Sequence, residues 1–496
     1  MSSTSALTLS SFIPMLPELF LLVMIIIIMM IDITLSKKYK NITYILSQLT
    51  LVFLAVLGWI YFNNETEYAF HGQFYIDNLA ILLKGFVYLA TFFVFSYSRT
   101  YLKKRNMQEG EYYLLVLLSV LGAMVLISSS NLITMYIGLE LMSLPLYALI
   151  ALRINKKQNG EAAIKYFVMG AIASGMLLYG MSFIYGVTGH LNIVEIAQYL
   201  TVHGAGEYKI VMLISMVFMI VAISLKLGIA PFHMWVPDVY EGSPNAVLAY
   251  LGTVPKLAAF GFMVTVLTQM LPMYEVEWSQ ILLVLAVISL LLGNIVALVQ
   301  NNIKRMFGYS TVSHMGFVFL ALAMGDNIGY AAAMYYVIVY VVMAVGGFGL
   351  ILLLSREGFE ADKISDFAGL NRRNSWLAFM MLIIMFSMAG IPPFAGFTAK
   401  LMVLNSLMQH GHYIVTVYAL VISVMAAYYY LRVIKVMYFD EPTDKKLIPV
   451  HKVNYIAISI NCLIIFLFGI FPIYLTEAIN IIYPTVSHVV PMAQLA

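Results

Sequence analysis

The sequence predicts an all-α membrane protein with about 14 transmembrane helices, including two inverted five-helix repeats that each contain a broken helix. Of its 496 residues, 62% are apolar and only 10% are charged, whereas an ordinary soluble domain carries about 25% charged residues. The mean hydropathy is +0.91. Apolar runs of about 20 residues, long enough to cross a bilayer, recur along the whole chain.

The expected membrane spans follow one another from residue 13 onward. They cover residues 13–35, 42–62, 76–98, 112–128, 131–151, 161–187, 209–229, 244–270, 278–299, 303–324, 328–354, 375–409, 411–434 and 453–475. The first 12 residues carry no Lys or Arg, so they lack the basic region of a secretory signal. We therefore interpret the first run as a retained helix.

The basic residues give an independent check on these spans, because 20 of the 27 fall in loops on one side. These 20 are Lys37, Lys38, Lys40, Arg99, Lys103, Lys104, Arg105, Arg153, Lys156, Lys157, Lys304, Arg305, Arg356, Lys363, Arg372, Arg373, Lys435, Lys445, Lys446 and Lys452. Basic loops stay in the cytoplasm. We therefore expect both termini on the periplasmic side of a bacterial inner membrane.

Several classes of function are excluded by absent residues and motifs. The single cysteine, Cys462, cannot supply a disulfide, a thiolate zinc site or an iron–sulfur cluster. No glycine-rich nucleotide-binding motif occurs. We expect no metal and no cofactor on this chain. We also expect no nucleic-acid partner, because the positions of the basic residues are explained by the membrane topology. We interpret the 33 methionines and 34 tyrosines as packing and interface residues.

Two matching segments interrupt the seventh and twelfth spans. Residues 228–232 read GIAPF and residues 390–394 read GIPPF. Gly and Pro break the helical hydrogen-bond ladder, and freed backbone at membrane depth must be buried or line a wet cavity. The two breaks are five spans apart, an odd number, so the segments run in opposite directions. Paired broken helices in inverted repeats are typical of secondary transporters, although a chance match of four positions is the alternative.

This repeat divides the chain into four parts. Residues 1–111 hold the first three spans, residues 112–270 the first repeat, residues 271–437 the second repeat, and residues 438–496 the last span and a short tail.

Three lysines lie deep in the membrane or beside the breaks: Lys226, Lys256 and Lys400. A charge at the bilayer centre costs roughly 2.5–3.5 kcal/mol, so each needs a reason to be there. Burial disfavours the charged form of lysine, whereas arginine keeps its proton. A deep lysine can therefore load and release protons. A fixed ion pair or a snorkelling stem is the alternative, and it applies most to Lys84 and Lys165.

Other polar residues within or near the spans are candidates for the same path. Glu140 shares a helix face with Ser143 and is expected to point inward and to pair with Lys226, or else to be a neutral buried carboxyl. His233 and His314 are candidate proton relays or satisfied hydrogen-bonding residues. We expect Arg432 to snorkel, Asp77 and Glu18 to mark span boundaries, and Asp238 and Glu241 to be solvated in a cytoplasmic loop.

These residues carry a family resemblance that covers essentially the whole chain. Residues 140–147, ELMSLPLY, resemble the fifth-span signature of the antiporter-like membrane-arm subunits of NADH-quinone oxidoreductase, respiratory complex I. Residues 226–242, KLGIAPFHMWVPDVYEG, resemble the signature of the subunit N type. The match continues through residues 253–256, 304–310 and 390–394.

Three features separate the subunit N type from its relatives L and M. The L type carries a long C-terminal lateral helix, but this chain stops about 20 residues after its last predicted span. The M type usually has a glutamate where Lys400 stands. The string PDVY at residues 237–240 also differs from the PDA of L and M. One irregularity remains, because aligning the breaks places Lys226 opposite Met388 and Lys400 opposite Asp238.

The resemblance implies a proton-translocating subunit driven by electron transfer from NADH to quinone elsewhere in the complex. FMN, iron–sulfur clusters, NADH and quinone would be bound by other subunits. The partners would be an M-type subunit and the small membrane subunits. Glu140 and Lys226 would form the coupling pair, Lys256 the connecting site and Lys400 the exit-side site. His233, His314 and Lys165 would be secondary.

Three other functions remain open from the sequence. The chain could belong to a multisubunit cation/proton antiporter, which would share the fold and the lysines. It could carry anions bound by Lys226 and Lys400, in which case arginine should serve as well. It could also be a scaffold, in which case neutralising Lys226 should leave transport intact.

Overall fold

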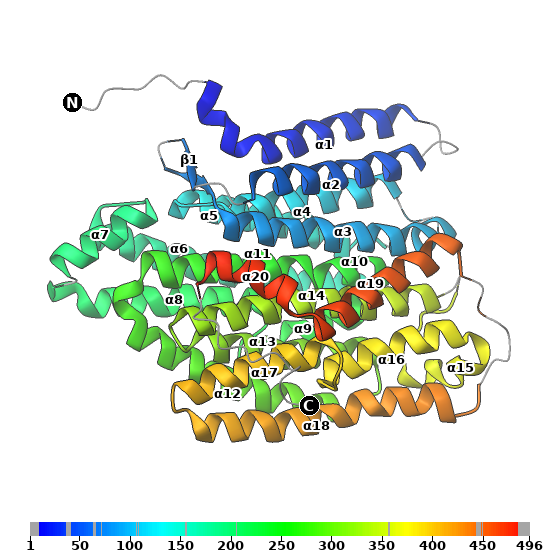
Figure 1. Ribbon diagram of the computed structural model, residues 1–496. Coiled ribbons are helices and arrows are strands. Elements are labelled where there is room, and N and C mark those ends of the chain that lie inside the picture. The colour runs from blue at the N-terminus through cyan, green and yellow to red at the C-terminus, as the bar shows by residue number, and fades with distance from the viewer. Residues whose placement is uncertain are drawn as a thin grey trace.

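The computed structural model describes residues 9–35, 41–62, 66–70, 72–105, 107, 109–153, 156–204, 206–355, 358–442, 448 and 450–484. Helices dominate this part of the chain, and most of them run side by side (Figure 1). The expected all-α membrane fold is therefore correct at the level of its class.

The N-terminal part contains three long helices and a hairpin. Its elements are a 3₁₀ helix (Leu9–Met15), α1 (Leu16–Thr34), α2 (Asn41–Tyr61), β1 (Glu67–Ala69), β2 (Phe74–Ile76) and α3 (Asn78–Lys104). The two strands pair antiparallel with Tyr68 opposite Tyr75. This hairpin, between the end of α2 and the start of α3, is not among the elements expected from the sequence.

The middle part begins with α4 and ends with a π-helical turn. Its elements are α4 (Glu109–Ile127), α5 (Leu132–Ile150), α6 (Lys157–Thr188), α7 (Ile193–His203), a 3₁₀ turn (Gly206–Tyr208), α8 (Lys209–Leu227), α9 (Trp235–Gly242), α10 (Asn245–Leu251), α11 (Val254–Val264) and the π segment (Thr265–Met270). The short helix α7 was also not anticipated.

The rest of the chain supplies nine further helices and two 3₁₀ turns. They are a 3₁₀ turn (Pro272–Tyr274), α12 (Glu275–Leu298), α13 (Ile303–Leu322), α14 (Asn327–Leu354), a 3₁₀ turn (Ile364–Phe367), α15 (Leu370–Arg373), α16 (Ser375–Ala389), α17 (Ala395–Gln409), α18 (Tyr413–Phe439), α19 (Lys452–Ile470) and α20 (Ile473–Ile482).

Within the described residues, 12 helices are long and apolar enough to cross a membrane. Two of the predicted spans are not among them. Residues 303–324 coincide with α13, which is more polar because it carries Lys304, Arg305 and His314. Residues 375–409 are divided into α16 and α17, which have 15 residues each.

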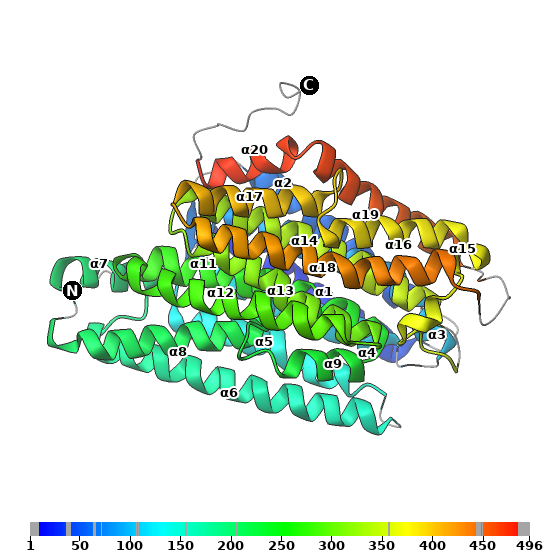
Figure 2. The same ribbon diagram turned by 90° about the horizontal axis from the view of Figure 1, so that it is seen from below.

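Helix α14 lies at the centre of the bundle, whereas α1 and α2 lie at one edge and α18 at the opposite edge (Figure 1). In the second view, α6 and α20 lie on opposite sides (Figure 2). The apolar windows of α14 and α1 have similar hydropathies, 2.7 and 2.6, yet 94% and 33% of their residues are buried. Hydropathy therefore does not separate helices that pack against protein from those with open faces.

Candidate functional site

The helical path is interrupted between α8 and α9, and a lysine from another helix hydrogen-bonds to the end of α8 at this break. Helix α8 ends at Gly228, whose φ of 78° is left-handed, and a Cβ there would lie 2.7 Å from a methyl group of Val236. Lys256 of α11 donates hydrogen bonds to the carbonyls of Lys226 at 2.9 Å and Leu227 at 2.8 Å. The last carbonyls of a helix lack intrahelical partners and carry partial negative charge, so an ammonium group satisfies both needs.

Lys226 extends from the same helix end toward α5. Its buried ammonium donates to the hydroxyl of Ser143 at 3.0 Å. Glu140, one turn earlier on α5, accepts a hydrogen bond from Ser174 of α6. Lys226 and Glu140 therefore each form a hydrogen bond with a serine, and the direct ion pair expected between these two described residues is absent.

We expected Glu140 and Ser143, which share one face of α5, to point into the bundle, and this is only partly correct. Ser143 is buried, but Glu140 is half-buried in the isolated chain. Ile137 and Leu144, one turn before and after Glu140, are 54% and 55% exposed. The Glu140 carboxyl consequently lies at the outer margin of the bundle, where α5 meets α6.

The second break, between α16 and α17, has a similar construction. Helix α16 ends at Gly390, whose φ is 84°. Lys400 of α17 donates to the carbonyl of Ala389 at 2.8 Å and to the hydroxyl of Ser423 on α18 at 2.8 Å. Its ammonium also lies 5.6 Å from the ring centre of Phe317 on α13.

His314 lies buried on α13, between α14 and α18. Its Nδ1 lies 2.9 Å from the hydroxyl of Tyr336, and its Nε2 lies 3.1 Å from the hydroxyl of Tyr430. Thr311 of the same helix contacts the hydroxyl of Tyr340, which donates to the carbonyl of Gly252 at 3.1 Å. These groups form a buried line from the loop before α11 to α14 and α18. Among the described residues, no hydrogen bond joins the Thr311–Tyr340 pair to His314, and none joins His314 to Lys400.

The expectation that the tyrosines are packing and interface residues is incomplete, because several of them form buried hydrogen bonds. A buried phenol usually finds a hydrogen-bond partner. Tyr336, Tyr340 and Tyr430 bond to His314, Thr311 and Ser310. Their presence inside long apolar runs was the available signal, but sequence spacing does not show which helix faces which.

Lys165 and His233 lie apart from this buried line. The Lys165 side chain is 43% exposed and forms ion pairs with Glu161 and Asp238, each at 2.8 Å. Asp238 also pairs with Arg305 at 2.8 Å, so the expectation that it is simply solvated is wrong. His233 is half-buried in the first break, with its ring centre 6.1 Å from that of Tyr309.

Two further expectations about charged residues need correction. Glu18 does lie in the first turn of α1, but it is also a buried ion-pair partner of Lys84, at 2.5 Å. Arg432 donates to the carbonyls of Leu298 and Gln300 at the end of α12 instead of snorkelling. Asp77 does mark a boundary, because it caps α3 by accepting from the Ala80 N–H, although burial raises the pKa of its carboxyl.

Comparison with known proteins decides the family. The family model described as NADH:quinone oxidoreductase/Mrp antiporter, TM, matches residues 129–426. NADH-quinone oxidoreductase subunit N of Thioalkalivibrio sulfidiphilus (strain HL-EbGR7) is 48% identical over 461 residues, which are 93% of this chain and 96% of that protein. The chain belongs to the NADH-quinone oxidoreductase subunit N family.

Solved structures agree with this assignment. A chain of respiratory complex I from Thermus thermophilus with bound aureothin has a TM-score of 0.80 and 27% identity, covering 93% of this chain and 99% of that chain. A chain of the Mrp complex from Dietzia sp. DQ12-45-1b has a TM-score of 0.84 at 19% identity, covering 96% and 98%. The latter likeness shows the antiporter-like fold alone.

As a member of the subunit N family, this chain is an antiporter-like, proton-translocating membrane-arm subunit of NADH-quinone oxidoreductase. Three of its buried lysines, Lys226, Lys256 and Lys400, lie at the two helix breaks, and His314 lies on α13, between the breaks in the sequence. The other two secondary candidates, Lys165 and His233, do not join this buried line through any hydrogen bond among the described residues.

Proposed function

We propose that protons move through this subunit along Lys226, Lys256, His314 and Lys400, with Glu140 setting the charge state of Lys226. The main support for this path is the set of hydrogen bonds that Lys226, Lys256 and Lys400 donate. Each donates to serine hydroxyls or helix-end carbonyls, and none has a carboxylate within ion-pair distance among the described residues. A lysine bonded only to neutral acceptors can lose its proton without leaving a buried carboxylate unpaired.

The opposite arrangement at Lys84 shows why this matters. Lys84 and Glu18 are both nearly inaccessible and bonded directly. Removing one charge from such a pair leaves the other buried and uncompensated, which strongly disfavours a change of charge. We assign this pair to the stability of the α1–α3 contact and not to proton movement.

We propose 14 membrane crossings, ten of which form two inverted five-helix repeats at residues 112–270 and 271–437. The broken helix α8–α9 would correspond to the broken helix α16–α17, and each broken helix would cross the membrane once. In both repeats a glycine of the first helix packs against backbone of the second. A Cβ on Gly122 of α4 would overlap Met142 of α5, and one on Gly293 of α12 would lie 2.8 Å from the Ser313 nitrogen of α13.

We further propose that the basic loops face the cytoplasm and that both termini face the periplasm, with residues 1–111 and 438–496 flanking the repeats. Arg105 after α3 and Arg153 after α5 both contact Glu360 after α14, at 3.2 and 2.8 Å, which supports one common side for these loops. Six of the expected basic residues lie outside the described residues: Lys37, Lys38, Lys40, Arg356, Lys445 and Lys446.

The outer position of Glu140 supports a partner subunit over the α5–α6 margin. An acidic side chain facing lipid is costly, and residues of this kind almost always face protein or a wet cavity. A neighbouring membrane subunit would cover Glu140 and carry a charge that acts on it. In this way a change elsewhere in the complex would reach Lys226.

The test is the variant Lys226→Ala in inverted membrane vesicles from host cells, with assembly of the complex checked. We expect NADH-driven quinone reduction and acidification of the vesicle interior to fall together. The double variant Lys84→Met/Glu18→Leu is the matched control, since it removes a buried pair away from the path and should keep both activities. If NADH oxidation and acidification are unchanged in Lys226→Ala and only sodium-dependent proton exchange is lost, the chain acts as a cation/proton antiporter subunit.

A further inference from the structure

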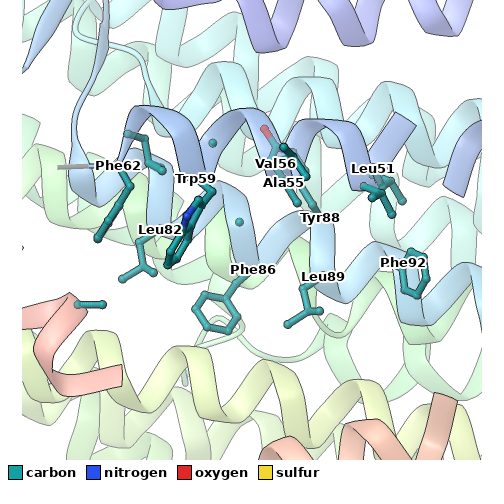
Figure 3. A pocket seen from close by; sticks show the side chains of 15 residues that line it. Leu51, Ala55, Val56, Trp59, Phe62, Leu82, Phe86, Tyr88, Leu89 and Phe92 are labelled. Atoms are coloured by element: carbon teal, nitrogen blue, oxygen red, sulfur yellow. The ribbon is translucent and has the colours of Figure 1, made fainter. Parts of the chain in front are cut away.

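A cavity of about 620 Å³ opens on the side of the bundle among α2, α3 and α20 (Figure 3). It is lined by residues between positions 51 and 59 of α2, Phe62 just after this helix, residues between 81 and 92 of α3, and Ala478 of α20. Pockets for small organic ligands usually measure about 300–1,000 Å³. The cavity thus has the capacity of a binding site, and it contains none of the residues of the proton path.

The chemistry of the lining selects an uncharged hydrocarbon. Among the described lining residues there is no charged side chain and no side-chain amide. Tyr88 and Trp59 carry its only side-chain polar atoms, and Phe62, Phe86 and Phe92 line it alongside them (Figure 3). A charged or hydrogen-bonding group would lose its water here without gaining partners, which costs free energy.

The length of the cavity matches one leaflet. Residues 81–92 of α3 extend over about 17 Å at 1.5 Å per residue, and the hydrocarbon core of a bilayer is about 30 Å thick. Trp59, next to the end of α2, is 80% exposed, and tryptophan prefers the level of the lipid headgroups. The lining therefore spans the half of the bilayer on the side where α2 ends and α3 begins.

Two glycines, Gly58 of α2 and Gly85 of α3, form part of the lining. A Cβ on Gly85 would meet no atom within 4 Å, so the space above this glycine is open.

We propose that this cavity binds one acyl chain of a phospholipid, drawn from the leaflet on the side where α2 ends, with Trp59 at the headgroup level. The acyl chain fills the space that the protein leaves between the α2–α3 pair and α20. It thereby joins α20, after the second repeat, to helices that precede the first repeat. This site is separate from the proton path, so it stands or falls independently of the proposed function.

The experiment uses the intact complex in vesicles that contain a phosphatidylcholine with a photoactivatable group on its acyl chain. After illumination, labelled peptides are mapped by mass spectrometry. We expect labelling of residues 51–62 and 81–92 to exceed labelling of the exposed face of α18. Gly85→Phe fills the open space and should reduce the labelling to the α18 level.

Gly175→Phe on α6 is the matched control, because Gly175 is also half-buried on a helix and its Cβ would also meet no atom within 4 Å. It should leave labelling of the cavity unchanged. If Gly85→Phe does not assemble, Gly58→Leu replaces it, since a Cβ there makes only an ordinary 3.8 Å contact with Ile81.

Three results would overturn the proposal. The wild-type cavity could be labelled no more than α18, or its labelling could persist in Gly85→Phe. Alternatively, protein cross-linking could capture residues 485–496 or another subunit against this lining, in which case a protein segment occupies it.

Discussion

The two helix breaks share a lysine cap, but the cap comes from different places. At the first break, Lys256 reaches back from α11 to the last carbonyls of α8. At the second, Lys400 reaches back from α17, the second half of the same broken helix, to the end of α16. The shared requirement is an ammonium group at a helix end whose carbonyls are otherwise unpaired at membrane depth.

The first break differs by one additional charge. Lys226 stands two residues before Gly228, with Ser143 and Glu140 on the neighbouring α5. Met388 occupies the corresponding place before Gly390. The comparison therefore pairs Lys256 with Lys400 by their contacts with helix ends, and it leaves Lys226 as a feature of the first break alone. It also explains why alignment of the two sequence segments did not superimpose the lysines.

The largest expected effect comes from Lys256→Met. This change removes both hydrogen bonds to the end of α8, and each unpaired buried carbonyl costs about 1–3 kcal/mol. We expect much less assembled complex and loss of NADH-driven acidification. The amount of intact complex on native gels and the acidification of inverted vesicles measure the two effects separately.

Lys400→Met sharpens the comparison, because it removes one carbonyl contact and one serine contact. We expect more intact complex than with Lys256→Met, since only one helix-end carbonyl loses its partner, a cost of about 1–3 kcal/mol. Acidification should still fall in the assembled complex. Equal assembly of the two variants would show that the caps do not differ in the way described.

Lys165→Ala should have the smallest effect. The side chain is 43% exposed, and its partner Asp238 keeps a second ion pair with Arg305. Exposed ion pairs contribute little, so acidification should change by less than about twofold. Complete loss of acidification in assembled complex would place Lys165 on the path after all.

The positions of the 12 long apolar helices and of the two interruptions could be predicted because they follow from local sequence. Long apolar runs predict helices, and the glycine and proline residues at 228–232 and 390–394 predict their interruption. The depth of Lys226, Lys256 and Lys400 followed from the same runs. These features need no knowledge of which helices are neighbours.

The partners of these lysines could not be predicted, since they are backbone carbonyls and hydroxyls on other helices. Nothing near Lys256 in the sequence indicates that it reaches the end of α8, 29 residues earlier. The tyrosine contacts of His314 likewise depend on α14 and α18 packing against α13. The Glu18–Lys84 pair joins residues 66 positions apart.

On the proposed path, Lys226 must release a proton and not merely carry a positive charge. Lys226→Arg tests it most directly, because arginine keeps the charge but is not deprotonated in proteins. In inverted vesicles with the complex assembled, we expect NADH-driven acidification to fall nearly as far as in Lys226→Ala. Acidification at the wild-type rate in Lys226→Arg would contradict the claim, since a fixed positive charge would then be sufficient.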